Sequence, residues 1–190
     1  MITQLILVRH GQTKWSATGK HTSVTDIDLD SVGIKQAKNL AEVLRELSPS
    51  AVFSSPLQRA TQTCELCGFK KYEILNELTE WNYGKYEGLT SDEIKKIDPN
   101  WSLFVHGTPG GEKPEDVYLR AQQLIRGLLS LDGTVICFSH GHISRVIASC
   151  WINQPVILAK HLFFEAAHFG ILSYEHNWPC ISAWNITHFQ

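Results

Sequence analysis

Short apolar runs alternate with stretches of helical spacing along this chain, and that alternation predicts an α/β fold. Apolar runs predict strands over residues 5–8, 51–54, 72–75 and 134–138. Amphipathic spacing predicts helices that start near Asp30 and at Ser55-Pro56, and others over 92–97, 117–128 and 143–151. Alternating aromatic and polar residues over 171–174 and 181–184 predict two antiparallel strands at one side of the sheet.

The order of these elements is β-α-β-α-β, a long insertion, and then α-β-α-β-β. The run 134–138 is apolar throughout, which is typical of a strand in a parallel sheet that helices cover on both faces. We therefore expect a three-layer α/β/α sandwich with a mostly parallel central sheet. A chain of 190 residues is short enough for residues 1–190 to form a single domain.

Three polar segments interrupt the pattern. Residues 12–29 have no usable period and predict a long surface loop, and residues 106–111 predict a flexible loop. Residues 76–88 are too aromatic and too polar for a core element, so we expect them to form the wall of a pocket. Long loops beside strand ends are often functional.

Composition and charge exclude several classes of protein. Hydrophobic residues make up 43% of the chain and charged residues 19%, with a net charge of -2, so neither disorder nor a general affinity for nucleic acid or a membrane surface is expected. No apolar run approaches the ~20 residues that a membrane span needs. Five cysteines cannot all pair, and the first residues lack a signal-peptide pattern, so a cytoplasmic location is expected.

Charged side chains gather at the ends of two predicted strands. The first strand ends in Arg9-His10-Gly11 and the last long strand in Ser139-His140-Gly141, while Arg59 lies one turn into the helix expected from Ser55. Ligands of such sheets bind beyond the carboxyl ends of the parallel strands, where both histidines are expected. Arginine suits phosphoryl oxygens, and a neutral histidine is a nucleophile. We therefore expect a cationic cup for a phosphoryl group.

Three motifs resemble the histidine phosphatase (phosphoglycerate mutase-like) superfamily: Leu7-Val8-Arg9-His10-Gly11-Gln12-Thr13, Ser54-Ser55-Pro56-Leu57-Gln58-Arg59-Ala60-Thr61-Gln62-Thr63 and Ser139-His140-Gly141. They occur in the family's order, with Leu78-Thr79-Glu80 between the second and the third. The resemblance implies a phosphoglycerate mutase-like fold and a nucleophile, His10, that becomes transiently phosphorylated. It also implies that Arg9, Arg59 and His140 complete the phosphate pocket and that Glu80 is the proton donor.

The same resemblance implies further contacts to the substrate. Thr22 and Ser23 resemble loop residues that touch the phosphate, and Tyr83 resembles a substrate-contacting tyrosine. Ser16 stands where many members have asparagine, so one phosphate donor is shorter. His142 either lies beside the substrate or simply belongs to the first turn of a helix. The expected substrate-binding residues are Gly11, Gln12, Ser16, Thr22, Ser23, Tyr83, Gly141 and His142, with Gly141 as a backbone donor.

Departures from the family pattern bear on the activity. Trp81-Asn82 stands where the mutases have Arg-His, and residues 88–110 are too few for their insertion with paired arginines, so mutase activity is disfavoured. Residues 79–88 resemble the sedoheptulose-bisphosphatase members. The expected function is therefore that of a phosphomonoester hydrolase, without metal or cofactor, that acts through a phosphohistidine on a small sugar phosphate or bisphosphate.

Two alternatives remain open: a phosphoprotein or nucleotide phosphatase with the same site, and a catalytically inactive module that binds phosphate or a partner protein. The expected partner is a small phosphorylated metabolite, not nucleic acid or a membrane, and a homodimer is an open alternative to a monomer. Candidates for binding a second phosphate are Lys20, His21, Lys85 and His106.

Cysteine and histidine patterns that suggest a metal have a simpler explanation. Cys64 and Cys67 have the spacing of a redox or zinc pair, but both fall on the apolar stripe of a helix, so core thiols are favoured. Scattered histidines could in principle join His140 and His142 as ligands, and their spacing gives this little support: His161, His168 and His176. No metal is therefore expected.

Overall fold

The computed structural model describes residues 2–189, in which one six-stranded sheet has the order β3-β2-β4-β1-β5-β6. The strands are β1 (Ile2–Arg9), β2 (Ala51–Ser54), β3 (Glu73–Ile74), β4 (Gly133–Ser139), β5 (Phe169–Glu175) and β6 (Trp178–Ile186). β1 to β4 run parallel, whereas β5 is antiparallel to β1 and β6 to β5. The predicted mostly parallel sheet with an antiparallel pair at one side is confirmed.

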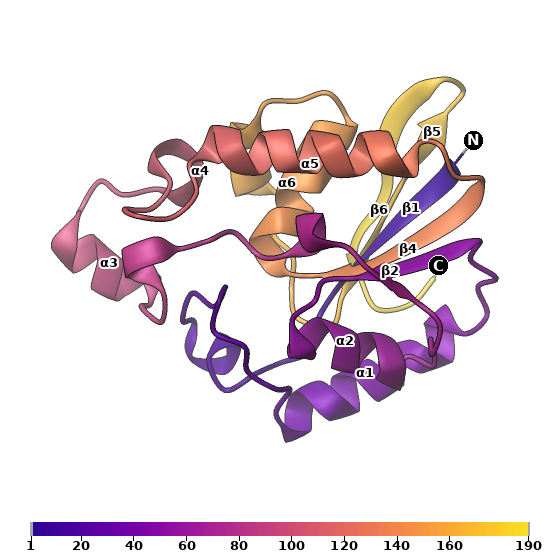
Figure 1. The fold of residues 1–190 in the computed structure, drawn as a ribbon, viewed down its shortest axis with the longest axis horizontal. Helices are drawn as coiled ribbons and strands as arrows, with labels where there is room; N and C mark the ends of the chain where they lie inside the picture. The colour runs from indigo at the N-terminus through magenta and orange to yellow at the C-terminus, as the bar shows by residue number, and fades with distance from the viewer. Residues whose placement is uncertain (1, 190) are drawn as a thin grey trace.

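Helices cover both faces of the sheet, as predicted. They are α1 (Ser31–Leu44), α2 (Gln58–Leu66), α5 (Pro114–Leu128) and α6 (Gly141–Trp151). In Figure 1, α5 and α6 lie above the sheet and α1 and α2 below it. The three-layer α/β/α sandwich is therefore confirmed.

Alternating side chains of the central strands explain how one strand supports both layers. On β1, Leu5 and Leu7 pack with the α5 and α6 residues, while Ile6 and Val8 pack with those of α1 and α2. Successive side chains of a strand point to opposite faces of its sheet. Because both faces of β1 are buried over residues 5–8, this part of its sequence is a continuous apolar run without a period of two.

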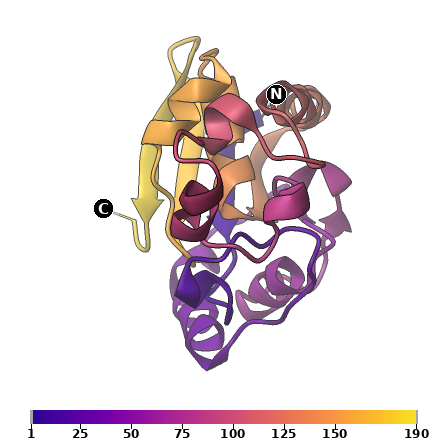
Figure 2. The ribbon, with the colours of Figure 1, turned by 90° about the vertical axis from the view of Figure 1, so that its left-hand side faces the viewer.

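The register of β1 and β4 brings the two strand ends together. These strands are neighbours, and Arg9 opposite Ser139 is their last pair. His10 and His140 consequently leave the sheet side by side, with ring centroids 5.1 Å apart. Figure 2 faces this end of the molecule, where connecting segments lie in front of the strands.

The prediction that a helix begins at Ser55-Pro56 is wrong, because α2 begins at Gln58. The Ser55 N–H donates to the Phe138 carbonyl at 2.9 Å, so this residue extends the pairing of β2 with β4. Its hydroxyl accepts from His140 at 2.8 Å and from the Leu57 N–H at 3.4 Å, but Leu57 is still extended, so the helix starts after it. The third strand is also shorter than predicted: β3 has two residues, both exposed at the edge of the sheet.

Short helices occupy the segments that connect the main helices and strands. They are η1 (Ser16–Thr18), η2 (Asn76–Leu78), η3 (Gly84–Tyr86), α3 (Ser91–Ile97), α4 (Leu103–His106) and η4 (Val156–His161). Only α3 matches a predicted helix, and it starts with a capping box at Thr90.

Residues 12–29 do not form a simple surface loop, because some of their side chains are buried. His21 and Ser23 are 8% and 3% exposed, and Lys20 pairs with Thr90 in an isolated bridge. Backbone bonds join His21 to Leu89 and Gly88 to His21, at 2.9 and 2.8 Å. Two segments far apart in the sequence are therefore held together beside the ends of the strands.

Candidate active site

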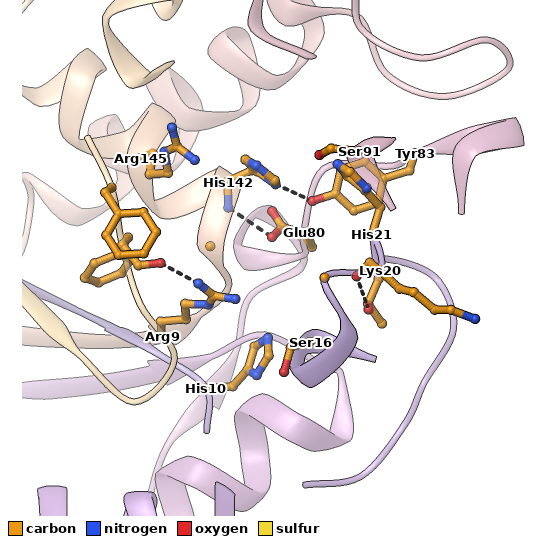
Figure 3. Close-up of a pocket in the computed structure, with 15 residues that line it drawn as sticks. Arg9, His10, Ser16, Lys20, His21, Glu80, Tyr83, Ser91, His142 and Arg145 are labelled. Atoms are coloured by element: carbon orange, nitrogen blue, oxygen red, sulfur yellow. Dashed lines mark hydrogen bonds between the residues drawn. The ribbon is translucent and has the colours of Figure 1, made fainter. Parts of the chain in front are cut away.

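A pocket of about 230 Å³ opens beside the carboxyl ends of β1 and β4 (Figure 3). Its walls are the end of β1, residues of the segment 16–22, Glu80, Tyr83, Ser91, the first two turns of α6, and residues 163–164. The pocket contains His10 and therefore lies where ligands of open α/β sheets bind.

His10 is oriented by its own backbone. The ring Nδ1 lies 2.7 Å from the Gly11 carbonyl, which only accepts, so Nδ1 carries the proton and donates it. The lone pair of Nε2 is then free. Burial, and secondarily the charges of Arg59 and Arg9, hold the His10 pKa well below its ordinary value. A neutral ring with an unprotonated Nε2 is a competent nucleophile.

Arg9 places a fixed positive charge on the pocket wall beside His10. Its Nη1 donates to the Phe164 carbonyl, and its Nε is buried without a partner among the residues described. Gly141 lies against this guanidinium: a Cβ there would be 3.3 Å from its central carbon and from Nε. A glycine therefore lets the start of α6 approach Arg9 closely, as an anion shared by both would require.

Glu80 lies at the N-terminus of α6. Its carboxylate accepts from the N–H groups of Trp81 and Ile143 at Oε1, at 2.9 and 2.8 Å, and of His142 at Oε2, at 3.0 Å. Two of these donors belong to the first turn of α6, where the backbone N–H groups have no acceptor within their own helix. The chain thus fixes a carboxyl group, 6% exposed, on the pocket wall.

Arg59 and His140 lie on the buried side of the site and do not line the pocket, although both are near His10. Arg59 Nε donates to His140 Nδ1 at 3.2 Å, so the His140 proton is on Nε2, which donates to Ser55. The remaining Arg59 nitrogens donate to carbonyls of residues 22, 23 and 25. Arg59 therefore connects the second histidine to the segment that covers the pocket.

Of the loop residues that were expected to contact the substrate, some line the pocket and others do not. Ser16 and Thr22 line the pocket. Gln12 donates to Asp30 at 3.0 Å, and the Ser23 hydroxyl donates to the Glu80 carbonyl at 3.3 Å, so neither side chain reaches this pocket.

Gly11 does not line the pocket either. A Cβ on Gly11 would lie 2.5 Å from the Gly33 carbonyl oxygen. Here the glycine permits close packing of the β1 end against α1.

Tyr83 and His142 form a polar wall opposite His10. The Tyr83 hydroxyl bonds to His142 Nδ1 at 2.6 Å. The His21 ring lies parallel to that of His142, with centroids 5.9 Å apart, and its Nδ1 donates to the Leu89 carbonyl at 2.8 Å. Of the predicted pocket wall 76–88, Glu80 and Tyr83 line this pocket, whereas Trp81 and Tyr86 belong to the core.

Arg145 and the phenylalanines at 163 and 164 also line the pocket, and sequence reasoning missed them. Arg145 is four residues after Gly141 on α6, so helical spacing from the predicted site could have found it. Phe163 follows no motif and could not have been found in that way.

Within residues 2–189, no group of three or more His, Cys, Asp or Glu side chains is arranged to hold a metal ion. Cys64 and Cys67 are free and fully buried, and burial raises the pKa of Cys67 to about 12, as expected of core thiols. Across the same residues, no helix has both the length and the apolar character of a membrane span.

We expect His10, His140 and His142 to stay neutral in the ligand-free protein at pH values where an ordinary histidine, with a pKa near 6.5, is mostly protonated. Burial lowers the pKa of each of them, and the nearby arginines add to the effect. NMR titration of ¹⁵N-labelled histidine from pH 8 to 5 would measure this, with the urea-unfolded protein as control. Protonation of His10 near the unfolded value would contradict the neutral nucleophile.

Comparisons with known proteins agree with this geometry. An acid phosphatase of Mycobacterium tuberculosis is 36% identical over 177 residues, which cover 91% of this chain and 87% of that protein. The sedoheptulose 1,7-bisphosphatase of Saccharomyces cerevisiae is 30% identical over 184 residues, which cover 80% and 68%. A solved structure of the product of a Mycobacterium tuberculosis open reading frame has a TM-score of 0.93 at 34% identity, over 98% of this chain and 99% of that one.

The match to the family extends over nearly the whole chain. The model of the histidine phosphatase superfamily (branch 1) matches residues 5–187, which include both strand ends with their histidines, Arg59 and Glu80. The phosphoglycerate mutase-like fold is thereby confirmed. The chain belongs to the histidine phosphatase superfamily, branch 1.

Proposed function

We propose that this protein is a phosphomonoesterase that forms a phosphohistidine on His10. The observation that carries the proposal is the orientation of this ring: Nδ1 donates to Gly11, so the unprotonated Nε2 remains for attack beside Arg9. Its depressed pKa keeps the ring neutral. A ring in this state can attack phosphorus without first losing a proton.

In the first step, Nε2 of His10 attacks phosphorus, an N–P bond forms, and the bond to the leaving oxygen breaks in line. Arg9 neutralises charge on the phosphoryl oxygens, and Arg59 adds positive potential from the buried side of His10. The Glu80 carboxyl group gives its proton to the leaving oxygen, so that the product leaves as an alcohol.

In the second step, the Glu80 carboxylate takes a proton from water, and the water oxygen attacks phosphorus. The N–P bond breaks, phosphate leaves, and His10 regains its neutral form with the proton still on Nδ1. Glu80 is protonated again and ready for the next turnover. The three N–H groups that hold Glu80 keep it in place during both transfers.

We further propose a small sugar phosphate or bisphosphate as substrate. A pocket of about 230 Å³ suits a compact molecule, and Tyr83, His142 and His21 supply polar groups on its walls. The similarity to a sedoheptulose 1,7-bisphosphatase supports this class, while the name of the more similar acid phosphatase specifies no substrate. Screening phosphometabolites and phosphopeptides for phosphate release would test the class, and a phosphopeptide that outcompetes every sugar phosphate would contradict it.

The phosphohistidine itself provides the direct test. Quenching the enzyme in alkali during turnover of p-nitrophenyl phosphate should trap an acid-labile phosphate, which mass spectrometry should locate on the peptide that contains His10. Turnover without a trapped phosphate on this residue, under quenching faster than one catalytic cycle, would favour direct attack by water. Absence of any phosphate release would favour the inactive binding module.

A further inference from the structure

Arg145 places a second fixed charge on the wall of the pocket, and the two steps proposed for His10 do not use it. Its Nε donates to the Ala159 carbonyl and its Nη2 to the Lys160 carbonyl, both at 2.8 Å. The guanidinium also lies over the ring of Phe104, 4.7 Å from the centroid. The group is therefore held in one orientation before any ligand binds.

Arg145 forms no ion pair with a carboxylate in the residues described, and the charge of Glu80 acts on it only without direct contact. The hydrogen bonds of Arg145 go to neutral carbonyls. Burial lowers its pKa to about 10, so the group is still a cation at neutral pH. A half-buried cation without an ion-pair partner, on the wall of a ligand pocket, is suited to an anion from solution.

The position of Arg145 on α6 separates it from the phosphoryl cup. It follows Gly141 by four residues, which places it on the same helix face and about 6 Å further along the axis. Gly141 packs against Arg9. Figure 3 shows Arg145 apart from Arg9 and His10, on the His142 side of the pocket. A molecule with its phosphoryl group at His10 can therefore extend toward Arg145.

The cations that the sequence offered for this role are less suitable. The Lys20 amine lies 5.6 Å from the centre of the Trp15 ring, and Figure 3 shows it directed away from the pocket. Lys85 and His106 do not line the pocket, and His106 accepts from the Ser102 N–H at 3.0 Å. His21 lines the pocket, but burial lowers its pKa, so its charge is not fixed.

We propose that Arg145 binds a second anionic group, a phosphate or a carboxylate, on the alcohol part of the substrate. The proposal rests on the phosphomonoesterase function, because the proton donor of that function, Glu80, is bonded to the start of α6 and so places the alcohol part on this side of His10. The preferred substrate is then a phosphomonoester with two separated anionic groups, and Arg145 determines that preference through binding.

Kinetics of Arg145→Gln should show a change of specificity. The ratio of kcat/KM for fructose 1,6-bisphosphate to that for p-nitrophenyl phosphate should fall about tenfold or more, mainly through KM, because a charge-assisted hydrogen bond to the distal group is lost. The same ratio measured with 3-phosphoglycerate, whose second anionic group is a carboxylate, shows whether Arg145 prefers a carboxylate or a phosphate. Arg145→Lys should retain part of the ratio, and Arg126→Gln, on the exposed face of α5, should leave it unchanged.

Because each ratio is measured within one protein preparation, a loss of folded protein cancels. An equal fall of kcat/KM for all three substrates would assign Arg145 to holding residues 159–160 and would overturn the proposal.

A binding measurement separates this proposal from the proposed function. In a His10→Ala background, calorimetry should show that fructose 1,6-bisphosphate binds at least about tenfold more weakly after Arg145→Gln, while inorganic phosphate binding changes much less. An unchanged affinity for the bisphosphate would overturn the anion site even if the wild type is a phosphatase. A wild type that hydrolyses none of the three substrates would instead overturn the function.

Discussion

Replacing His10 with alanine should reduce kcat/KM for p-nitrophenyl phosphate by about four orders of magnitude or more, because the nucleophile and the groups around it act as one unit. The ring supplies the nitrogen of the N–P bond. Its neighbour His140 cannot take over this role, because both ring nitrogens of His140 are engaged, by Arg59 and by Ser55. Steady-state kinetics would measure the loss, with His188→Ala as the matched control on an exposed side chain.

The His10→Ala variant should still fold, because the ring makes one hydrogen bond, to its own neighbour Gly11. Thermal melting would confirm that the protein is intact. If the folded variant keeps one tenth or more of the wild-type activity, His10 is not the nucleophile. Its position on the pocket wall would then be that of a binding contact only.

Replacing Glu80 with glutamine should slow the hydrolysis of sugar phosphates by about 10²-fold or more and that of p-nitrophenyl phosphate much less. A sugar alkoxide is a strong base and needs a proton as it leaves, whereas p-nitrophenolate is a weak base and leaves without one. The comparison of two substrates therefore reports on the proton donor itself. Glu73→Gln, on the exposed edge strand β3, is the matched control.

Glutamine at this position also disturbs the start of α6, and the comparison of two substrates separates this effect from the loss of the proton donor. One side of the amide would present N–H to the N–H of His142, which now donates to Glu80 Oε2 at 3.0 Å. An unmade buried bond of this kind costs about 1–3 kcal/mol. A smaller amount of folded enzyme lowers the rates for both substrates by the same factor, so the ratio of the two rates still reports on the proton donor. Equal losses on both substrates would remove Glu80 from the acid role.

Much of the architecture could be predicted because helices and strands impose their own periods on the sequence. The start of α1 at Asp30, whose side chain accepts from the Gly33 N–H at 2.8 Å, is a local signal. The Ser55-Pro56 signal failed because distant residues engage Ser55: its N–H donates to the Phe138 carbonyl, and its hydroxyl accepts from His140. Local rules for helix ends hold only where no other segment competes for the same polar groups.

The sequence could predict which segments form the candidate site, but not which of their side chains point into the pocket. Ser16 and Thr22 line the pocket as expected, but Gln12 and Ser23 form bonds elsewhere. An irregular segment has no period that would show which side chains face the ligand. Each side chain points to the partner that the fold brings within reach, and such partners come from distant parts of the chain.

By itself, the sequence determined that two buried parallel strands end in Arg9-His10 and Ser139-His140, since continuous apolar runs mark such strands and their carboxyl ends share one edge of the sheet. Only the tertiary structure decided that Glu80 and the N-terminus of α6 meet, which puts this carboxyl group on the wall of the pocket that contains His10. The physical reason is that these positions depend on how the insertion and α6 pack together, and no local pattern encodes a contact between segments more than 60 residues apart.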